Sequence, residues 1–404
     1  MDCKVTNQVD WRGWVTPKYA KDKAIHRWYL FPHSFTGDLV YALVNEWSLD
    51  SKDLILDPFA GSGTTLLAAK EMGIPCAGYD LSPLAVLASN TKTKTFSHQH
   101  LEALWQSLEH TLLRNNSVVM SRTYPELVHR ALPEGRLEAL NAVSMEIENI
   151  DCSLAEKNFF RLALISIIPH FSYAVANGGW LRWLNQGACA ENVNRLFKEQ
   201  VEMMLSDVCD TPNQDDGKWQ AHLADARSMP APDATYSAVI TSPPYPNRHD
   251  YTRIFGVELM FAFHDWETNR ELRYQTFHSH PEAHPNRPDA AGYVPPDELE
   301  CIVRDLSDKR IKSMLKGYFL DMYLCLRDVS RVCCRGAHVA FVVGNAQYDG
   351  KAVHVDEFTA EIGEQTGLIC KEIRAVRWRG NSAQQMGKYG RMAARESVVI
   401  FVKP

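Results

Sequence analysis

Residues 57 to 65 read DPFAGSGTT. They overlap the end of a short apolar run, Leu54–Phe59, and lead into a helical pattern, Leu66–Met72. This order predicts a strand, a glycine-rich turn and a helix. Gly61 and Gly63 let a ligand approach the backbone, and the amides that open the helix face a ligand beyond the end of the strand. The stretch therefore predicts either a nucleotide-type binding turn or only a tight connection between the two elements.

The ligand expected at this turn is a nucleotide without a triphosphate. Gly63 is followed by Thr64, so the lysine of a phosphate-binding P-loop is absent. A second strand pattern, Cys76–Tyr79, ends at Asp80, about 20 residues after the turn, where a carboxylate suits the hydroxyls of a ribose. Asp225 lies at the end of another strand pattern, His222–Ala226, and suits the amino group of an adenine. Each acid taken alone is equally consistent with a helix cap.

A second motif, TSPPY at residues 241 to 245, directly follows the strand pattern Ser237–Ile240. Two consecutive prolines fix φ and remove two backbone donors, so the loop is stiff and its carbonyl oxygens are free to accept hydrogen bonds. Acceptors beside the ring of Tyr245 suit the exocyclic amine of a planar base that stacks on the ring. In an arbitrary protein these residues more often form only a turn.

Together, DPFAGSGT at 57–64 and TSPPY at 241–245 resemble the motifs of the S-adenosylmethionine-dependent DNA methyltransferases that modify exocyclic amines, the cytosine-N4 and adenine-N6 class. The resemblance covers most of the chain outside residues 97–213, and includes His33–Asp38 and the helix after it. It implies S-adenosyl-L-methionine as the cofactor and DNA as the partner. Asp80 then holds the ribose and Asp225 the adenine. The residues that it assigns to the methionine part are Phe35, Asp57, Phe59, Gly61, Gly63 and Thr64.

The resemblance also implies that Ser242, Pro243, Pro244 and Tyr245 carry the chemistry. The Ser242 hydroxyl and the Pro243 carbonyl accept the two amine hydrogens, while Tyr245 stacks on a base flipped out of the duplex. Methyl transfer is then a direct displacement, because the loop holds no cysteine for the covalent attack that cytosine-C5 chemistry needs. Serine at 242, where adenine enzymes tend to carry Asp or Asn, favours cytosine N4.

Three alternatives remain beside a site-specific cytosine-N4 DNA methyltransferase. The same pocket serves an adenine-N6 DNA methyltransferase or an RNA base methyltransferase. A non-catalytic nucleic-acid-binding module is the alternative from another class, and the intact Gly61, Gly63, Asp80, Ser242 and Tyr245 argue against it. If the protein is such an enzyme, a restriction or defence protein is a further expected partner.

The pattern of elements predicts an α/β fold: a Rossmann-like, seven-stranded methyltransferase sheet with a closing antiparallel hairpin and a helical insertion. Residues 1–96 are expected to form the N-terminal segment and the first half of the methyltransferase domain. Residues 97–213 form the helical insertion, a candidate for target recognition. Residues 214–404 form the second half, with a long loop at 269–298.

The end of the chain is basic, with eight lysines or arginines and two glutamates in Lys371–Pro404. The strand patterns Ile369–Trp378 and Ser397–Val402 predict a hairpin whose loop emerges near Ser242. The residues expected there to contact DNA phosphates are Arg377, Arg379, Lys388 and Arg391. A solvated hairpin tip is the alternative, in which case the insertion or the loop at 269–298 reads the DNA.

The composition is that of an ordinary globular chain of 404 residues, with 45% hydrophobic and 23% charged residues. A formal net charge of −6 excludes a polycation that binds nucleic acid indiscriminately. The apolar runs are far shorter than a bilayer, and we expect no membrane contact and a cytoplasmic protein. No metal is expected, because the ten cysteines form no CxxC pair and His278, His280 and His284 lack ligand spacing.

Overall fold

The structure is a computed structural model of the whole chain. It describes residues 4–32, 34–114, 122–133, 135–177, 180–184, 192–208, 216–380, 387, 390 and 393–404.

Eight strands form the central sheet: β1 (Lys4–Asn7), β2 (Ile55–Asp57), β3 (Cys76–Asp80), β6 (Trp219–Leu223), β7 (Tyr236–Thr241), β8 (Cys333–Gly344), β11 (Ile369–Gly380) and β12 (Ala393–Val402). Their order is β1-β11-β12-β8-β7-β2-β3-β6. Neighbouring strands from β8 to β6 pair in parallel, and β12 is antiparallel to both β8 and β11. The predicted α/β sheet with a closing antiparallel hairpin is therefore confirmed.

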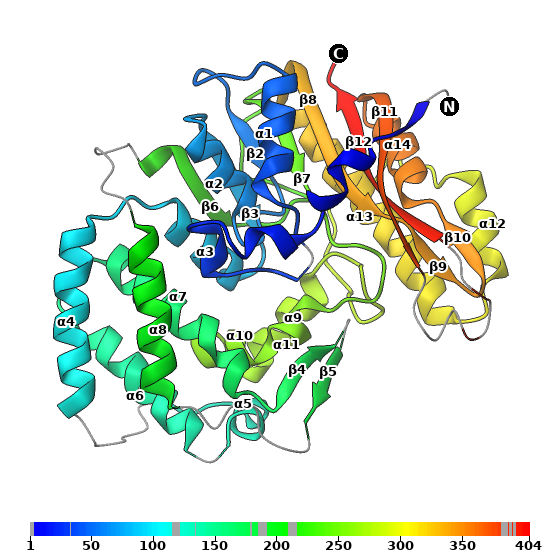
Figure 1. Cartoon of the computed structure of the whole chain (residues 1–404). Helices are drawn as coiled ribbons and strands as arrows, with labels where there is room; N and C mark the ends of the chain where they lie inside the picture. The colour runs from blue at the N-terminus through cyan, green and yellow to red at the C-terminus, as the bar shows by residue number, and fades with distance from the viewer. Residues whose placement is uncertain are drawn as a thin grey trace.

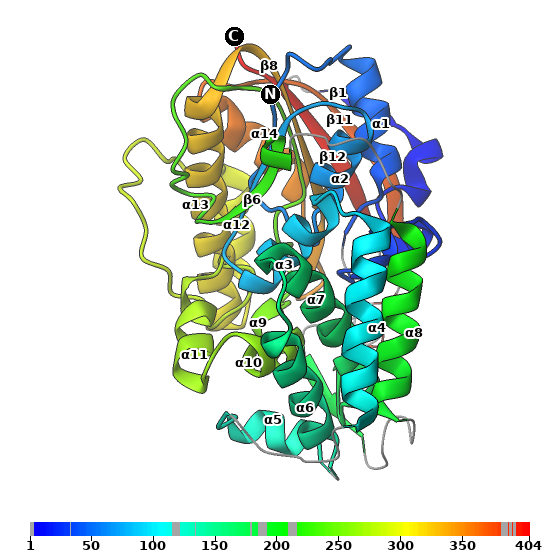
Figure 2. The ribbon, with the colours of Figure 1, turned by 90° about the vertical axis from the view of Figure 1, so that its left-hand side faces the viewer.

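Helices cover both faces of this sheet: α1 (Gly37–Glu46), α2 (Thr64–Glu71), α13 (Lys309–Val332) and α14 (Val355–Gln365). Along β8, Val339 and Phe341 pack in one core with α13 and α14, whereas Ala340 and Val342 pack in another core with α1 and α2. This alternation is the two-residue period of a strand buried on both faces. The result is a three-layer body, in which the sheet lies between the two helical layers (Figure 2).

The predicted helical insertion is present and builds a separate core. Figure 1 shows its helices gathered away from the closing hairpin. Its longest helix starts with a capping box, in which the Ser153 hydroxyl accepts from the Glu156 amide and the Glu156 carboxylate accepts from the Ser153 amide. A hairpin of two strands follows that helix and was not predicted. The elements are α4 (His98–Arg114), α5 (Glu126–Ala131), α6 (Arg136–Asn149), α7 (Leu154–Phe171), β4 (Ala174–Asn177), β5 (Trp180–Trp183) and α8 (Val193–Asp207).

Two helices outside residues 97–213 share the core of the insertion. They are α9 (Tyr251–Ile254) and α10 (Gly256–Ala262), which follow the TSPPY motif along the chain. The insertion is thus packed against the segment that leaves the predicted target loop. The division at 1–96, 97–213 and 214–404 stays a prediction.

Several predicted boundaries were wrong. The strand expected near His222–Ala226 lies at Trp219–Leu223, so Asp225 is two residues beyond its end. The loop expected at 269–298 begins inside α11 (Trp266–Gln275), whose N-terminus is capped by Asp265, and α12 (Asp297–Asp305) starts before its end. The remaining elements are α3 (Pro83–Thr93), β9 (Ala346–Tyr348), β10 (Lys351–Val353) and the 3-10 helices η1 (Val9–Gly13), η2 (Pro17–Ala20), η3 (His26–Trp28) and η4 (Asp216–Lys218).

The sheet also has one strand more than the seven predicted. β1 is short and mostly exposed, and it pairs in parallel with β11 at the edge of the sheet.

In the part of the chain that the structure describes, no helix is long and apolar enough to cross a membrane.

The turn between β2 and α2 requires glycine at position 63. Gly63 has φ +82°, and a Cβ there would lie 2.7 Å from the Cα of Ser89. Gly73 has a similar φ of +72°, but a Cβ there would meet nothing within 4 Å. We expect Gly73→Ala to cost about 1–2 kcal/mol through left-handed strain alone, and Gly63→Ala to cost more, because the backbone of α3 must also move. Thermal unfolding of both variants checks this, and equal melting temperatures would contradict it.

Candidate cofactor and target-amine site

A cleft of about 1160 Å³, including the part open to solvent, lies at the carboxyl ends of β2, β3 and β7. Parallel strands bring the residues that follow them to one edge of a sheet, where α/β folds bind their ligands. Three residues predicted for the cofactor or the target amine, Gly63, Pro243 and Tyr245, are not among those that line it. The predicted residues that do line it are Phe35, Asp57, Phe59, Gly61, Thr64, Asp80, Asp225, Ser242 and Pro244.

Asp57 joins the two sequence motifs. Its Oδ1 accepts hydrogen bonds from the Thr241 hydroxyl at 2.6 Å and the Phe59 amide at 3.1 Å, and its Oδ2 accepts one from the Thr65 hydroxyl at 2.6 Å. The residue is 2% exposed. Burial raises the pKa of its carboxyl group to about 6, although the hydroxyl and amide donors favour the charged form. All three donors belong to the protein, so the structure shows Asp57 as a link between the glycine turn and the target loop. Its contact with the methionine part of the cofactor stays a prediction.

Asp80 holds the glycine turn from the neighbouring strand. Its Oδ2 accepts a hydrogen bond from the Gly61 amide at 2.9 Å, and its Oδ1 accepts one from the Ser82 amide at 2.8 Å. Burial raises the pKa of this carboxyl group, while the amide donors lower it. Each carboxylate oxygen retains acceptor capacity toward the cleft. This geometry suits the ribose hydroxyls that the sequence analysis assigned to Asp80.

Asp225 is held by an arginine that the sequence analysis missed. The Arg227 guanidinium pairs with Asp225 at 2.6 Å and with Asp321 of α13 at 3.1 Å, and Arg227 is 2% exposed. Asp321 is completely buried and also pairs with Arg287 at 2.7 Å. Two arginines thus balance two acids, and the network ties the predicted adenine acid to the loop at residues 276–296. An arginine two residues after Asp225 was visible in the sequence, but its partner nearly a hundred residues away was not.

The target loop places Ser242 and Pro244 on the cleft and Tyr245 behind them. The Ser242 hydroxyl donates to the Val342 carbonyl at 3.1 Å. Tyr245 is 8% exposed, and burial raises the pKa of its phenol. Tyr251 of α9 lines the same cleft as Ser242, together with several phenylalanines, whereas Tyr245 does not. Tyr251 was not predicted, because it belongs to the helix after the motif rather than to the motif.

The predicted basic loop differs from the structure. Arg377 and Arg379 lie within β11, which extends to Gly380, because the strand pattern continues past Trp378. Both side chains pair with Glu396 of β12, at 2.5 Å and 3.0 Å. They are therefore not free arginines of a loop. Lys388 and Arg391 fall outside the described residues.

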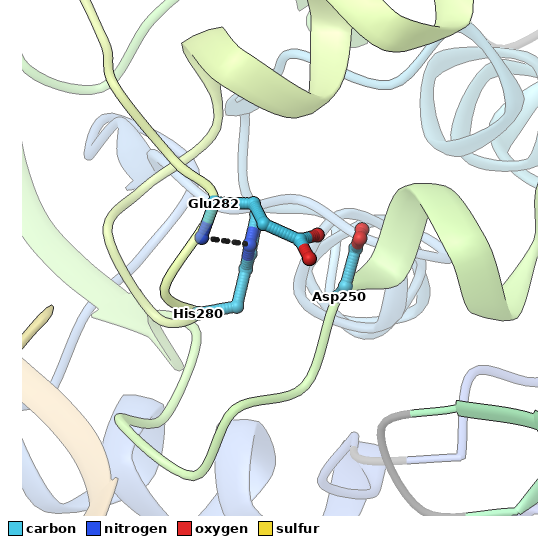
Figure 3. Close-up of side chains that lie close together, drawn as sticks. All are labelled: Asp250, His280 and Glu282. Carbon is cyan, nitrogen blue, oxygen red and sulfur yellow. Dashed lines mark hydrogen bonds between the residues drawn. The ribbon is translucent and has the colours of Figure 1, made fainter. Parts of the chain in front are cut away.

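One of the three histidines that were not expected to bind a metal, His280, meets two acids at the wall of the cleft. Figure 3 shows the carboxylates of Asp250 and Glu282 next to the ring of His280, in the spacing of a metal site. However, the Glu282 amide donates to the His280 Nδ1, and Arg273 and Arg253 pair with Asp250 and Glu282 at 2.9 Å and 2.7 Å. The two guanidinium groups already neutralise the acids, so the cluster is best explained as a structural support and we assign no metal to it.

The strand order and the acids after adjacent strands define the class of the S-adenosylmethionine-dependent α/β methyltransferases. A family model described as DNA methylase matches residues 5–90. The Type II methyltransferase M.BsoBI of Geobacillus stearothermophilus is 30% identical to this chain over 97% of the chain and 88% of the relative. The Type II methyltransferase M.AvaI of Nostoc sp. is 28% identical over 95% and 87%.

The chain belongs to the Type II DNA methyltransferases that modify exocyclic amines, and S-adenosyl-L-methionine is the cofactor of this family. Among solved structures, one of geranyl diphosphate methyltransferase with S-adenosylmethionine is 7% identical, with a TM-score of 0.35 over 100% of this chain and 98% of that one. The residues of the cleft fit the cofactor: Asp80 and Asp225 present carboxylate oxygens at neighbouring strand ends, and Gly61 leaves room beside them.

Replacing one of these carboxylates tests the cofactor site. We expect Asp80→Asn to weaken S-adenosylmethionine binding by about 1–3 kcal/mol, because the amide is uncharged and offers fewer acceptor sites to the ribose hydroxyls. Calorimetric titration measures the affinity. Asp297→Asn, an exposed acid on α12, is the matched control and should leave the affinity unchanged. An affinity in Asp80→Asn equal to that of the control would remove Asp80 from the site.

Proposed function

We propose that this enzyme methylates N4 of a cytosine flipped out of a specific DNA site. The observation that carries the proposal is Ser242 on the cleft wall, on a loop that Asp57 links to the cofactor turn. Serine rather than an acid or amide at this position favours cytosine over adenine. As a Type II enzyme it is also proposed to act beside a restriction enzyme that reads the same site.

The chain's own residues would raise the reactivity of the amine. An aromatic amine is a poor nucleophile because its lone pair is delocalised into the ring. Because the Ser242 hydroxyl donates its proton to the Val342 carbonyl, its lone pairs remain available to accept one amine hydrogen. The Pro243 carbonyl would accept the other. Two acceptors on one side bend the amine toward tetrahedral geometry and return the lone pair to nitrogen.

The cofactor supplies an electrophilic methyl group on its sulfonium when bound. Asp80 and Asp225 would hold its ribose and adenine, and the turn at Gly61 to Thr64 its methionine end. Because Asp57 joins that turn to Thr241, the methyl carbon and the amine nitrogen would be held in line within one rigid frame. No covalent intermediate with the protein is needed.

Two tyrosines are proposed to stack on the flipped base. Tyr245 belongs to the motif but is buried, and Tyr251 lines the same cleft as Ser242. Base flipping requires such a ring to replace the stacking that the base loses in the duplex. The segment that carries Tyr251 contacts β4 and β5 of the insertion. This contact supports the proposal that the insertion takes part in target recognition.

The reaction product tests the proposal. DNA from a host that expresses the enzyme should contain N4-methylcytosine by mass spectrometry, and Ser242→Ala should lower its amount by at least about tenfold, since one oriented acceptor is lost. Sequencing of the modified DNA then identifies the site. If only N6-methyladenine is found, the target base is adenine and not cytosine. If only RNA is methylated, DNA is not the substrate. If no methylated product forms, a nucleic-acid-binding module is favoured over an enzyme.

A single arginine beside the target loop is proposed to contact DNA. Arg248 has a φ of +67°, its amide donates to the Ser279 carbonyl at 3.0 Å, and its guanidinium forms no ion pair with any described residue. A strained arginine three residues after the target loop, with no ion pair among the described residues, suggests a contact with the ligand. Lys388 and Arg391 stay candidates for further phosphate contacts.

Salt dependence tests the role of Arg248. We expect Arg248→Ala to weaken DNA binding and to make the slope of log K against log salt less negative by about 0.9, because one phosphate contact is lost. S-adenosylmethionine affinity should not change. An unaltered slope would exclude a phosphate contact for this residue.

A further inference from the structure

Glu396 is a buried carboxylate in the middle of the closing hairpin. The residue is 2% exposed, and it lies opposite Arg377 in the register of β11 and β12. It pairs with Arg377 at 2.5 Å and with Arg379 at 3.0 Å. A carboxylate at this depth persists only when it is paired and hydrogen-bonded, and the two guanidinium groups meet that requirement.

Arg379 connects this carboxylate to the target loop. Its guanidinium carbon lies 5.8 Å from the ring centre of Tyr245. At Gly344, the last residue of β8, a Cβ would lie 2.8 Å both from an Arg379 nitrogen and from the edge of the Tyr245 ring. Glycine is therefore required where the strand, the guanidinium and the ring meet. The Arg379 guanidinium and the edge of the Tyr245 ring thus both pack against the bare backbone of Gly344, which limits the movement of the ring.

We propose that Glu396 and Arg379 are positioning residues for methyl transfer, which hold the Tyr245 ring and through it the loop from Ser242 to Tyr245. The proposal rests on the proposed role of that loop. In this account Arg379 does not contact DNA phosphates. Its guanidinium is directed toward Glu396 and Tyr245, although the one carboxylate shared by Arg377 and Arg379 leaves the cluster with a net charge of +1.

The chemistry of the pair explains why both members are needed. A planar guanidinium bonds a carboxylate through a fixed fork and packs flat on an aromatic ring, which the ammonium of lysine does not reproduce. Without the Glu396 charge, the cations of Arg377 and Arg379 repel each other, and Arg379 turns toward solvent. A displacement of about 1 Å in a group that aligns reactants can cost about 100-fold in rate.

Three variants test the proposal: Glu396→Gln, Arg379→Lys and Arg379→Ala. With DNA that carries the site identified by sequencing, we expect each to lower kcat by about 10- to 100-fold while the KM for DNA changes less than about threefold. The slope of log KM against log salt should stay that of the wild type. S-adenosylmethionine affinity by calorimetry should also be retained, which shows that the cofactor half of the site is intact.

A matched control uses another arginine of the same sheet. Arg335 is exposed near the start of β8, at the opposite end of the strand from Gly344. Arg335→Ala removes the same charge from the protein and should leave kcat and KM unchanged.

The opposite result identifies Arg379 as a phosphate contact instead. In that case Arg379→Ala raises KM and makes the salt slope less negative by about 0.9 at unchanged kcat, and Arg379→Lys retains activity. Glu396→Gln would then tighten DNA binding, because it releases the arginine. If thermal unfolding shows that Glu396→Gln does not fold, Arg379→Lys decides, since it keeps the charge on Glu396 balanced.

The proposed role of the loop fails in a different way. If Ser242→Ala keeps the kcat of an active wild type, the loop does not hold the amine, whatever the Arg379 variants do. If Ser242→Ala is inactive while Arg379→Lys and Glu396→Gln match the wild type, the positioning role of Glu396 and Arg379 is contradicted and the role of the loop is retained.

Discussion

The carboxylate of Asp57 is the interaction on which the site depends. It stands between the glycine turn after β2 and the target loop after β7, with the Thr65 hydroxyl on one oxygen and the Thr241 hydroxyl on the other. Burying this charge is costly and raises the pKa of the carboxyl group, and three hydrogen bonds offset part of that cost. Because one side chain binds both motifs, the cofactor turn and the target loop cannot shift independently. Alignment of a methyl donor with an amine requires such a frame.

Two further buried acids extend the frame outward. Asp321 joins Arg227 and Arg287, and so ties the predicted adenine acid to the loop at residues 276–296. Glu396 of β12 pairs with Arg379 of β11, whose guanidinium faces the ring of Tyr245. Removing one partner from a buried pair typically costs about 3–5 kcal/mol, so each network acts as a rigid joint. The cleft is thus bounded by elements from both halves of the sheet, held by charges rather than by apolar packing alone.

Local patterns explain how much of this could be predicted from the sequence. The order of strand, glycine turn and helix around Gly61 is a local pattern, as is the pair of prolines just after the strand that ends at Thr241, and both motifs of the site were found in this way. Pairings between distant segments leave no such pattern. Arg227 pairs with Asp321 on α13, and Arg379 pairs with Glu396 across the hairpin. Arg379, which the sequence presented as a free loop arginine, is therefore part of an ion pair. The edge strand β1 is too short and too exposed to have a clear hydrophobic period.

A crystal structure with DNA that carries the target site and a non-reactive cofactor analogue tests the account most directly. We predict the analogue in the cleft with Asp80 at its ribose, and a flipped base whose exocyclic nitrogen lies about 3–3.5 Å from the position of the transferable group. The Ser242 hydroxyl and the Pro243 carbonyl should accept its hydrogens. A base held away from Ser242, or an analogue bound outside the cleft, would contradict the central claim that the linked turn and loop form one methyl-transfer site.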